Sequence, residues 1–245
     1  MIGLFKSHFS IGKSILRIDS PGGSQYGADN IIDMAKEAGM DQIILVEDSL
    51  IGFLHSNKVA KEAGINLIFG LRIDCVLSKN QDEFPGKIIV FAKNGNGCKL
   101  LNKIFTKANF GDDSSITISD LKSIWSNENL KLAIPFYDSF LYNNCMFFSN
   151  CIMDFSFTEP TFFIESNSLP FDELISNKVK EYALSNGYNT EQVQTIYYKN
   201  RSDIEAFQTY KCICNRKFGN KTLSKPNLDH FSSDEFSFES FLEKR

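Results

Sequence analysis

The sequence predicts an α/β fold in which parallel strands alternate with helices. Three observations point to it. Short runs rich in β-branched and aromatic residues recur along the chain, stretches with helical apolar spacing separate them in place of hairpin turns, and glycines close several of those stretches. With 245 residues, 42% of them hydrophobic, the chain is long enough to bury one sizeable core. One domain is the economical interpretation.

Seven segments have the composition of strands. They cover residues 2–5, 42–46, 67–73, 87–92, 131–136, 161–165 and 192–198. The segments between them are mostly long enough to hold a helix, and parallel neighbours need a crossover connection of that kind. We therefore expect the strands to run parallel.

The helices have recognisable ends. The first begins near Asp29 or Asn30 and is predicted to end at Gly39, because a residue without Cβ adopts the left-handed cap at little cost. The second is expected over about 51–63, ending at Gly64. Apolar stripes predict three more helices, near residues 100–105, at 171–182 before Gly187, and at 204–210 after a capping box formed by Ser202 and Glu205.

Two segments fall outside this alternation. Residues 21–27 read Pro-Gly-Gly-Ser-Gln-Tyr-Gly without a phosphate-binding motif, and we interpret them as a flexible rim loop. After residue 217 the α/β pattern ends, which divides the chain into a domain at 1–217 and an acidic, Phe-rich tail at 218–245. Ser232 and Glu235 are candidate caps of a short terminal helix.

The tail carries five apolar side chains of interest: Phe231, Phe236, Phe238, Phe241 and Leu242. One interpretation is an apolar stripe folded back on the domain. The other is a docking surface for a partner protein, since aromatic residues at helical spacing suit a groove.

Charge and composition exclude several classes of protein. The net charge of −4 gives no overall attraction to nucleic acid or anionic lipid. No signal peptide or bilayer-spanning apolar run is apparent, so a cytoplasmic protein is expected, without membrane association. Six cysteines without a Cys-x-x-Cys pair signal neither a disulfide framework nor a structural zinc site.

Several segments carry a family resemblance. Residues 35–40 (Ala-Lys-Glu-Ala-Gly-Met), 60–65 (Ala-Lys-Glu-Ala-Gly-Ile), 91–94 (Phe-Ala-Lys-Asn) and 134–140 resemble the PHP domain, named for polymerase and histidinol phosphatase. The likeness is to the domain that opens bacterial DNA polymerase III alpha subunits, and to phage-encoded versions most of all. It implies a distorted seven-stranded (β/α)7 barrel in a single domain.

Active members of that family use His, Asp, Glu or Cys ligands to hold metal ions that activate water against a phosphoester. The resemblance implies that three such ligands remain here, His8, Asp48 and Glu165. It implies that six ligand positions are replaced, by Lys6, Ser49, Arg72, Lys87, Thr195 and Tyr197. Ammonium and guanidinium groups have no lone pair to give a cation. We therefore expect no catalytic residue, no metal and no other cofactor.

Three of the replacements are cations: Lys6, Arg72 and Lys87. One hypothesis is that they supply internally the positive charge that Asp48 and Glu165 would otherwise obtain from a metal. Drift in an unselected site is an equal alternative, and binding of a phosphate or nucleic-acid backbone is a third. His8, without its partner ligand, is expected to be a hydrogen-bonded structural residue.

The resemblance implies a non-catalytic module of a DNA replication complex. Its partner would be a DNA polymerase, a proofreading exonuclease or both, with only indirect association with DNA, in the host cytoplasm if a phage encodes the protein. A polymerase palm cannot fit in the chain. The alternatives are a residual metal-dependent phosphoesterase or 3′–5′ exonuclease held by the three remaining ligands, and a nucleic-acid or nucleotide binder without turnover.

Overall fold

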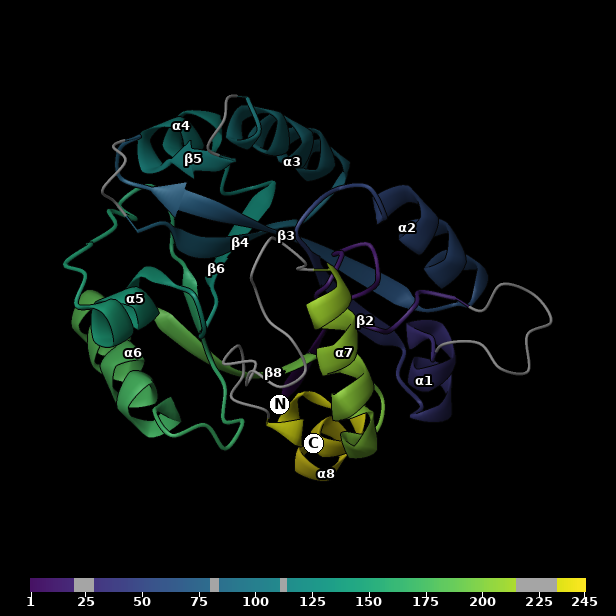
Figure 1. Ribbon diagram of the computed structural model, residues 1–245. Coiled ribbons are helices and arrows are strands. Elements are labelled where there is room, and N and C mark those ends of the chain that lie inside the picture. The colour runs from purple at the N-terminus through teal and green to yellow at the C-terminus, as the bar shows by residue number, and fades with distance from the viewer. Residues whose placement is uncertain (20–28, 80–83, 111–113, 215–232) are drawn as a thin grey trace.

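The protein forms a closed barrel of seven strands. The computed structural model describes residues 1–19, 29–79, 84–110, 114–214 and 233–245. The strands follow one another around the barrel in the order β2, β1, β8, β7, β6, β4 and β3, and β3 pairs with β2 to close it (Figure 1). Their bounds are β1 (Ile2–Phe5), β2 (Gln42–Glu47), β3 (Asn66–Val76), β4 (Gly86–Ala92), β6 (Leu130–Ile134), β7 (Thr161–Ile164) and β8 (Asn189–Ile196). The predicted α/β barrel and its seven strands are confirmed.

The expectation of parallel strands is wrong at β4. This strand runs antiparallel to both of its neighbours, β3 and β6. The described part of the connection from β3 holds no helix, and a parallel return would need a crossover of a dozen or more residues. A further strand, β5 (Ser115–Thr117), pairs with β3 outside the closed ring. Its three residues were too few to stand out in the sequence.

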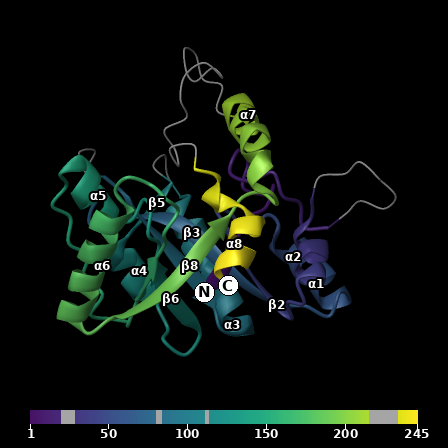
Figure 2. The ribbon, with the colours of Figure 1, turned by 90° about the horizontal axis from the view of Figure 1, so that it is seen from below.

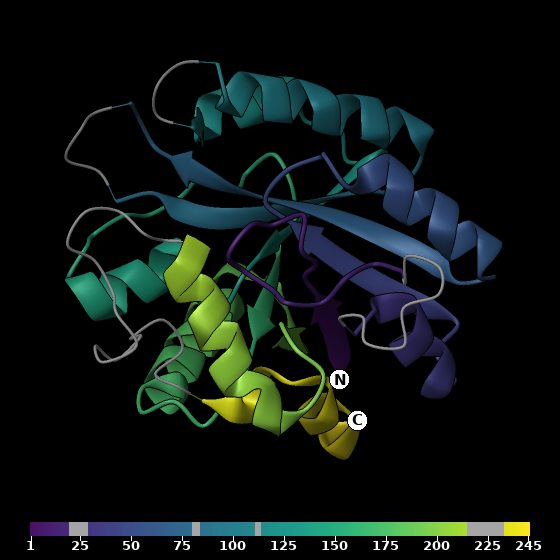
Figure 3. The ribbon, with the colours of Figure 1, turned by 45° about the vertical axis from the view of Figure 1, so that its right-hand side comes forward.

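Most helices surround the outside of the barrel, as Figures 1 and 3 show, whereas α7 (Ile204–Cys214) projects at one end of it (Figure 2). The others described are α1 (Ile31–Glu37), α2 (Phe53–Glu62), α3 (Gly95–Ala108), α4 (Ile118–Ile124), α5 (Phe140–Phe147), α6 (Asp172–Asn186) and α8 (Phe238–Lys244). Asn30 caps α1 by accepting a hydrogen bond from the Asp33 amide at 2.8 Å. Gly39 (φ +62°) and Gly187 (φ +69°) take the left-handed conformation at the predicted ends of α1 and α6.

The predicted capping box before α7 is shifted. It forms between Asn200 and Asp203, whose carboxylate accepts from the Asn200 amide at 2.7 Å, and it opens a short 3₁₀ turn, Arg201–Asp203, before the helix. Asn and Asp serve as well as Ser and Glu in this motif, so the two-residue offset was not evident from the sequence. The N-cap of α8 is Ser237; Ser232 lies outside the described residues, as do residues 21–27.

The barrel interior is apolar at mid-height. Leu4, Val46, Ile89, Phe163 and Val193 belong to one buried cluster there. Two larger clusters fill the space between the strands and the surrounding helices. No helix among the described residues is long and apolar enough to cross a bilayer.

The C-terminal helix is part of the core. Phe236, Phe238 and Phe241 are buried, and Phe238 and Phe241 join the cluster that contains Phe5 of β1. A Cβ on Gly3 would lie only 3.0 Å from the Phe241 ring, so glycine permits this close approach. Both termini lie side by side next to α8 in all three ribbon views (Figure 2).

Arg201 holds the same segment by charge, with Nη1 at 3.0 Å from Glu235 Oε1 and Nη2 at 2.5 Å from Glu243 Oε2. The structure therefore supports the folded-back interpretation for Phe236, Phe238 and Phe241, whose side chains are not available on the surface for docking. Leu242 is 43% exposed, and Phe231 lies outside the described residues.

Candidate functional site at the polar end of the barrel

Polar side chains gather at one end of the barrel. Lys6 follows β1, Glu165 follows β7, and Thr195 lies near the end of β8; since carboxyl ends of parallel strands meet at one edge, these residues converge. Arg72 and Tyr197 join them in the lining of a small cavity. We call this region the polar end. Apolar residues of the mid-height cluster form the floor of its cavity.

The cavity at the polar end has a volume of about 40 Å³. That is room for roughly three water molecules. The side chains that face it thus fill most of the barrel opening at this end.

Lys6 and Asp48 form the central ion pair. Lys6 Nζ donates to Asp48 Oδ1 at 2.7 Å, and Lys6 is only 3% exposed. Arg72 Nη1 lies 4.0 Å from the same oxygen. Burial lowers the pKa of Lys6, against the pull of Asp48. Burial also opposes ionisation of Asp48, but Lys6 and Arg72 outweigh it and hold the pKa of Asp48 below its usual value.

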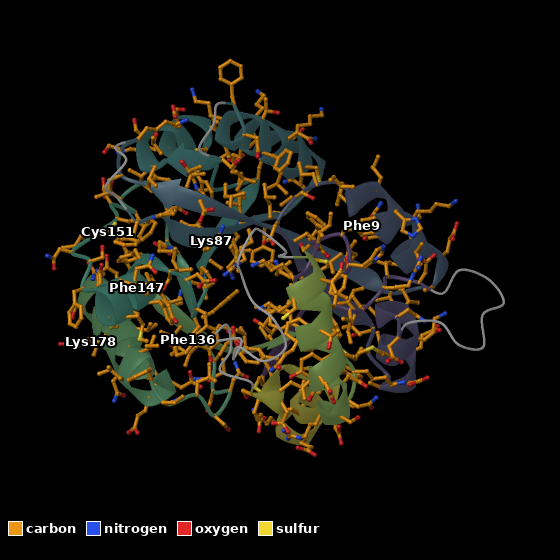
Figure 4. The ribbon with its side chains drawn as sticks, viewed as in Figure 1. Phe9, Lys87, Phe136, Phe147, Cys151 and Lys178 are labelled. Atoms are coloured by element: carbon orange, nitrogen blue, oxygen red, sulfur yellow. The ribbon has the colours of Figure 1, made fainter. Side chains whose placement is uncertain are left out.

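The other two cations are also paired with carboxylates. Arg72 Nη2 donates to Asp138 Oδ2 at 2.7 Å. Lys87, labelled in Figure 4, donates to Asp74 Oδ2 at 2.5 Å across the β3–β4 pairing, where the two residues are direct neighbours. Sequence reasoning missed Asp74 and Asp138. A signal for Asp74 was its position on β3 two residues after Arg72, which places both side chains on the same face of the strand.

Glu165 is stabilised in a different way. It is buried, and its carboxylate accepts hydrogen bonds from the Thr195 amide at 2.9 Å, the Thr195 hydroxyl at 2.8 Å and the Asn167 side-chain amide at 3.0 Å. Burial raises the pKa of Glu165 in spite of these donors. Cations therefore compensate the charge of Asp48, whereas neutral donors satisfy Glu165.

Glu47, beside Asp48, is buried like Glu165. It accepts from the Ser7 amide at 2.9 Å, from the Ser7 hydroxyl at 2.6 Å and from the Ser10 hydroxyl. Ser10 Oγ in turn accepts from the Asp48 amide at 3.0 Å. Burial raises the pKa of Glu47. The loop after β1 is thereby tied to the end of β2, a role that the serines at positions 7 and 10 could have suggested.

Of the remaining predicted site residues, His8 and Ser49 lie apart from the cavity, whereas Tyr197 lines it. His8 is not in the cavity lining; its ring centroid lies 4.3 Å from that of Phe9, and its buried Nδ1 has no hydrogen-bond partner among the residues that the structure describes. Burial lowers the pKa of His8. Ser49 Oγ accepts from the Ile51 amide at 3.4 Å, ahead of α2. Tyr197 stacks on Phe207 with ring centroids 5.3 Å apart.

The structure does not bring His8, Asp48 and Glu165 together as one ligand set. Within the described residues, no group of three or more His, Cys, Asp or Glu side chains is arranged to hold a metal ion. Asp48 is engaged by Lys6, Glu165 by Thr195 and Asn167, and the ammonium of Lys6 has no lone pair to offer. This donor set does not fit the metal centre that the resemblance would imply.

Comparison with known proteins gives one family match. Residues 20–133 match the family model described as PHP domain, a range that includes Asp48, Ser49, Arg72 and Lys87 but excludes Lys6, His8, Glu165, Thr195 and Tyr197. No curated protein matches the sequence.

Two solved structures resemble the fold. A Bifidobacterium adolescentis protein, provisionally described as a metal-dependent phosphoesterase, aligns at 8% identity over 79% of this chain and 87% of its own, with a TM-score of 0.45. PsfC from Pseudomonas syringae aligns at 10% identity over 78% and 74%, with a TM-score of 0.43. Likenesses this distant carry no inference about activity. The family match covers residues 20–133, which is 114 of the 245 residues.

Proposed function

We propose that this protein is a non-catalytic PHP-domain protein that serves as an interaction module for a DNA polymerase or a proofreading exonuclease. The proposal has two parts, with different support. The absence of catalysis is supported by the contacts at the polar end. The replication partner is supported by the sequence resemblance to polymerase III alpha subunits.

The observation that carries the first part is the Lys6–Asp48 ion pair. An ammonium group 2.7 Å from Asp48 Oδ1 occupies one of the positions from which a metal ion would bind this carboxylate. A divalent cation approaching Asp48 would also meet the Arg72 guanidinium, 4.0 Å from the same oxygen. Displacing both cations would cost Lys6, which is almost fully buried, its ion pair with Asp48, whereas Arg72 would keep its ion pair with Asp138.

The two alternatives fit the contacts less well. A phosphoesterase or exonuclease would require Asp48 and Glu165 to exchange their present partners for a metal. A phosphate or nucleic-acid binder would require free cations, whereas Lys6, Arg72 and Lys87 each already contact a carboxylate.

Metal analysis tests the first part. The protein is expected to retain no stoichiometric zinc or manganese after purification in their presence, and to hydrolyse bis(p-nitrophenyl) phosphate at the background rate with either ion added. A matched Lys6→Met variant separates two reasons for the lack of metal. If the variant binds metal, the ammonium of Lys6 excludes the ion by repulsion; if it does not, the missing ligands are the reason. Stoichiometric metal together with turnover by the unmodified protein would contradict the proposal.

Affinity purification tests the second part. A tagged protein, expressed in its native cell or infected host, is expected to recover a polymerase or an exonuclease, identified by mass spectrometry. Recovery should persist when metal is chelated and when nuclease removes DNA, because the association is expected to be between proteins. A thorough purification that returns neither enzyme would contradict this part and leave the first part standing.

A further inference from the structure

The opposite end of the barrel is open. At the amino ends of the parallel strands lies a chamber of about 460 Å³, lined among others by Ile2, Ile44, Ile68, Phe91, Ala133 and Phe163. Leu4 and Phe163 line both this chamber and the cavity at the polar end, so they separate the two. We call it the apolar chamber. Its volume lies within the range of ligand-binding pockets in proteins.

The wall of the apolar chamber packs against the buried interior cluster on one side and keeps apolar surface that no described residue covers completely. Ile2, Ile44 and Ile68 come from three adjacent strands and are only half-buried. Inside a closed barrel such residues normally pack against one another. A concave apolar surface that remains accessible to water gains free energy when an apolar ligand covers it.

One side of the rim is cationic. Lys131 lies on β6 directly opposite Phe91 of β4, and Lys93 follows β4, so the two lysines belong to adjacent strands. Both are exposed; Lys93 Nζ donates to the Asn127 carbonyl at 2.7 Å, and Lys131 makes no ion pair with any described residue. Glu191, also on the rim, lies on β8, two strands from β6 and offset from Lys131 along the strands.

The lysines also mark the exit of the chamber. Lys93, Lys131 and Thr161 line both the apolar chamber and a neighbouring polar groove, which passes residues such as Ser156 and Asn189. A ligand with an apolar body in the chamber would therefore place its polar end at the two ammonium groups, where a negative charge is favoured.

We propose that the apolar chamber binds a free alkyl carboxylate, with the hydrocarbon chain inside the barrel and the carboxylate between Lys93 and Lys131. The site is separate from the polar end and does not depend on the function proposed above. A carboxylate suits this rim because two cations flank one exit, while Glu191, the acid in the lining of the described chamber, lies on a different strand and Glu159 lies in the groove beyond the exit.

Calorimetric titration with a series from hexanoate through octanoate to decanoate tests the proposal, at concentrations below micelle formation. Affinity is expected to rise about fourfold with each added methylene until the chamber is filled. Decanol and decylamine are the matched probes without the negative charge and should bind at least tenfold more weakly than decanoate. Equal binding of all three, or no binding of any carboxylate, would overturn the proposal.

Variants locate the site. Lys131→Glu should weaken decanoate binding at least tenfold, while Lys180→Glu on the outer helix α6 should leave it unchanged. Ile68→Phe fills the chamber and should shorten the longest chain accepted, and Glu191→Gln should bind as tightly as the parent or more tightly. Circular dichroism confirms folding of each variant; since Lys131 is exposed, its substitution tests the site even if Ile68→Phe fails to fold. Decanoate binding unaffected by both Lys131→Glu and Ile68→Phe would place it elsewhere and overturn the assignment.

Discussion

Asp48 and Glu165 are two carboxylates at the same end of one barrel, and the protein stabilises them by opposite means. Asp48 is paired with the ammonium of Lys6 and lies near the Arg72 guanidinium, and these cations keep its pKa low. Glu165 accepts three hydrogen bonds from neutral donors, and burial raises its pKa.

This difference shows that a buried carboxylate does not need a counter-ion. An internal cation compensates for burial by charge, and a set of donors compensates by hydrogen bonding. The two solutions differ in how they respond to substitution and to pH, and that difference can be measured.

The largest effect is expected from breaking the ion pair. Asp48→Asn leaves the Lys6 ammonium buried without its partner, and we expect a loss of about 2–3 kcal/mol in the free energy of unfolding, because Asp48 is itself partly exposed. Urea denaturation measures the loss. The exposed Asp41→Asn is the control and should change the same quantity by less than about 0.5 kcal/mol.

The double variant Lys6→Met, Asp48→Asn removes both charges and should recover most of that stability. If it is as unstable as the sum of the two single variants, the pair contributes no coupling energy, and the role assigned to Lys6 is wrong.

A smaller loss of unfolding free energy is expected when one hydrogen bond to Glu165 is removed. Thr195→Val keeps the shape and the backbone amide but removes the hydroxyl donor to Glu165, which should cost about 1–2 kcal/mol in unfolding free energy. Thr190→Val, at an exposed position of the same strand, is the matched control. Equal stability of the two variants would show that the hydroxyl does not stabilise Glu165.

The two carboxylates should also give opposite pH dependences. Asp48 has a lowered pKa when folded, so its contribution is present above the unfolded value of 3.8 and is lost as the pH falls through the folded value. Glu165 has a raised pKa, so its contribution is greatest below 4.5 and is lost as the pH rises through the folded value.

Urea denaturation at several pH values, with Asp48→Asn and Glu165→Gln as references, measures these slopes. The parent should gain stability relative to Asp48→Asn, and lose it relative to Glu165→Gln, as the pH rises. Each slope is at most about 1.4 kcal/mol per pH unit. Slopes of the same sign would show that the two carboxylates do not contribute to stability with opposite pH dependences.

No gain of activity is expected from restoring two histidines. In Lys6→His with Ser49→His, Arg72 and Lys87 remain cations and Thr195 still binds Glu165, so hydrolysis of bis(p-nitrophenyl) phosphate should stay at the parent's rate with zinc or manganese. Robust metal-dependent turnover by this variant would refute the interpretation of the polar end.

The barrel strands could be predicted because each is a compact apolar run between clear breaks. The direction of β4 could not be predicted, because it depends on whether the connection before it holds a helix. The expectation of parallel strands assumed a helix in every connection. The strand β5 is too short to give a periodic signal.

At the candidate site, the sequence pointed to polar residues near the strand ends but did not reveal which residues they contact. Asp74 and Asp138 pair with Lys87 and Arg72 through strand register and loop conformation. Asp138 has a positive φ of 61°. The separation of His8 from Glu165 likewise depends on where side chains point after the strands end, and residue spacing does not encode that.

The closure of the barrel by β1 and β8 has a consequence for synthesis. Leu4 pairs with Ile44 on one side and with Thr195 on the other, so one edge of β1 stays unpaired until β8 has emerged from the ribosome. A nascent chain therefore carries an open strand edge through most of translation, and such edges can pair with other chains. Slow ribosomes or crowded polysomes should lower the yield of this protein more than that of a fold built from local contacts.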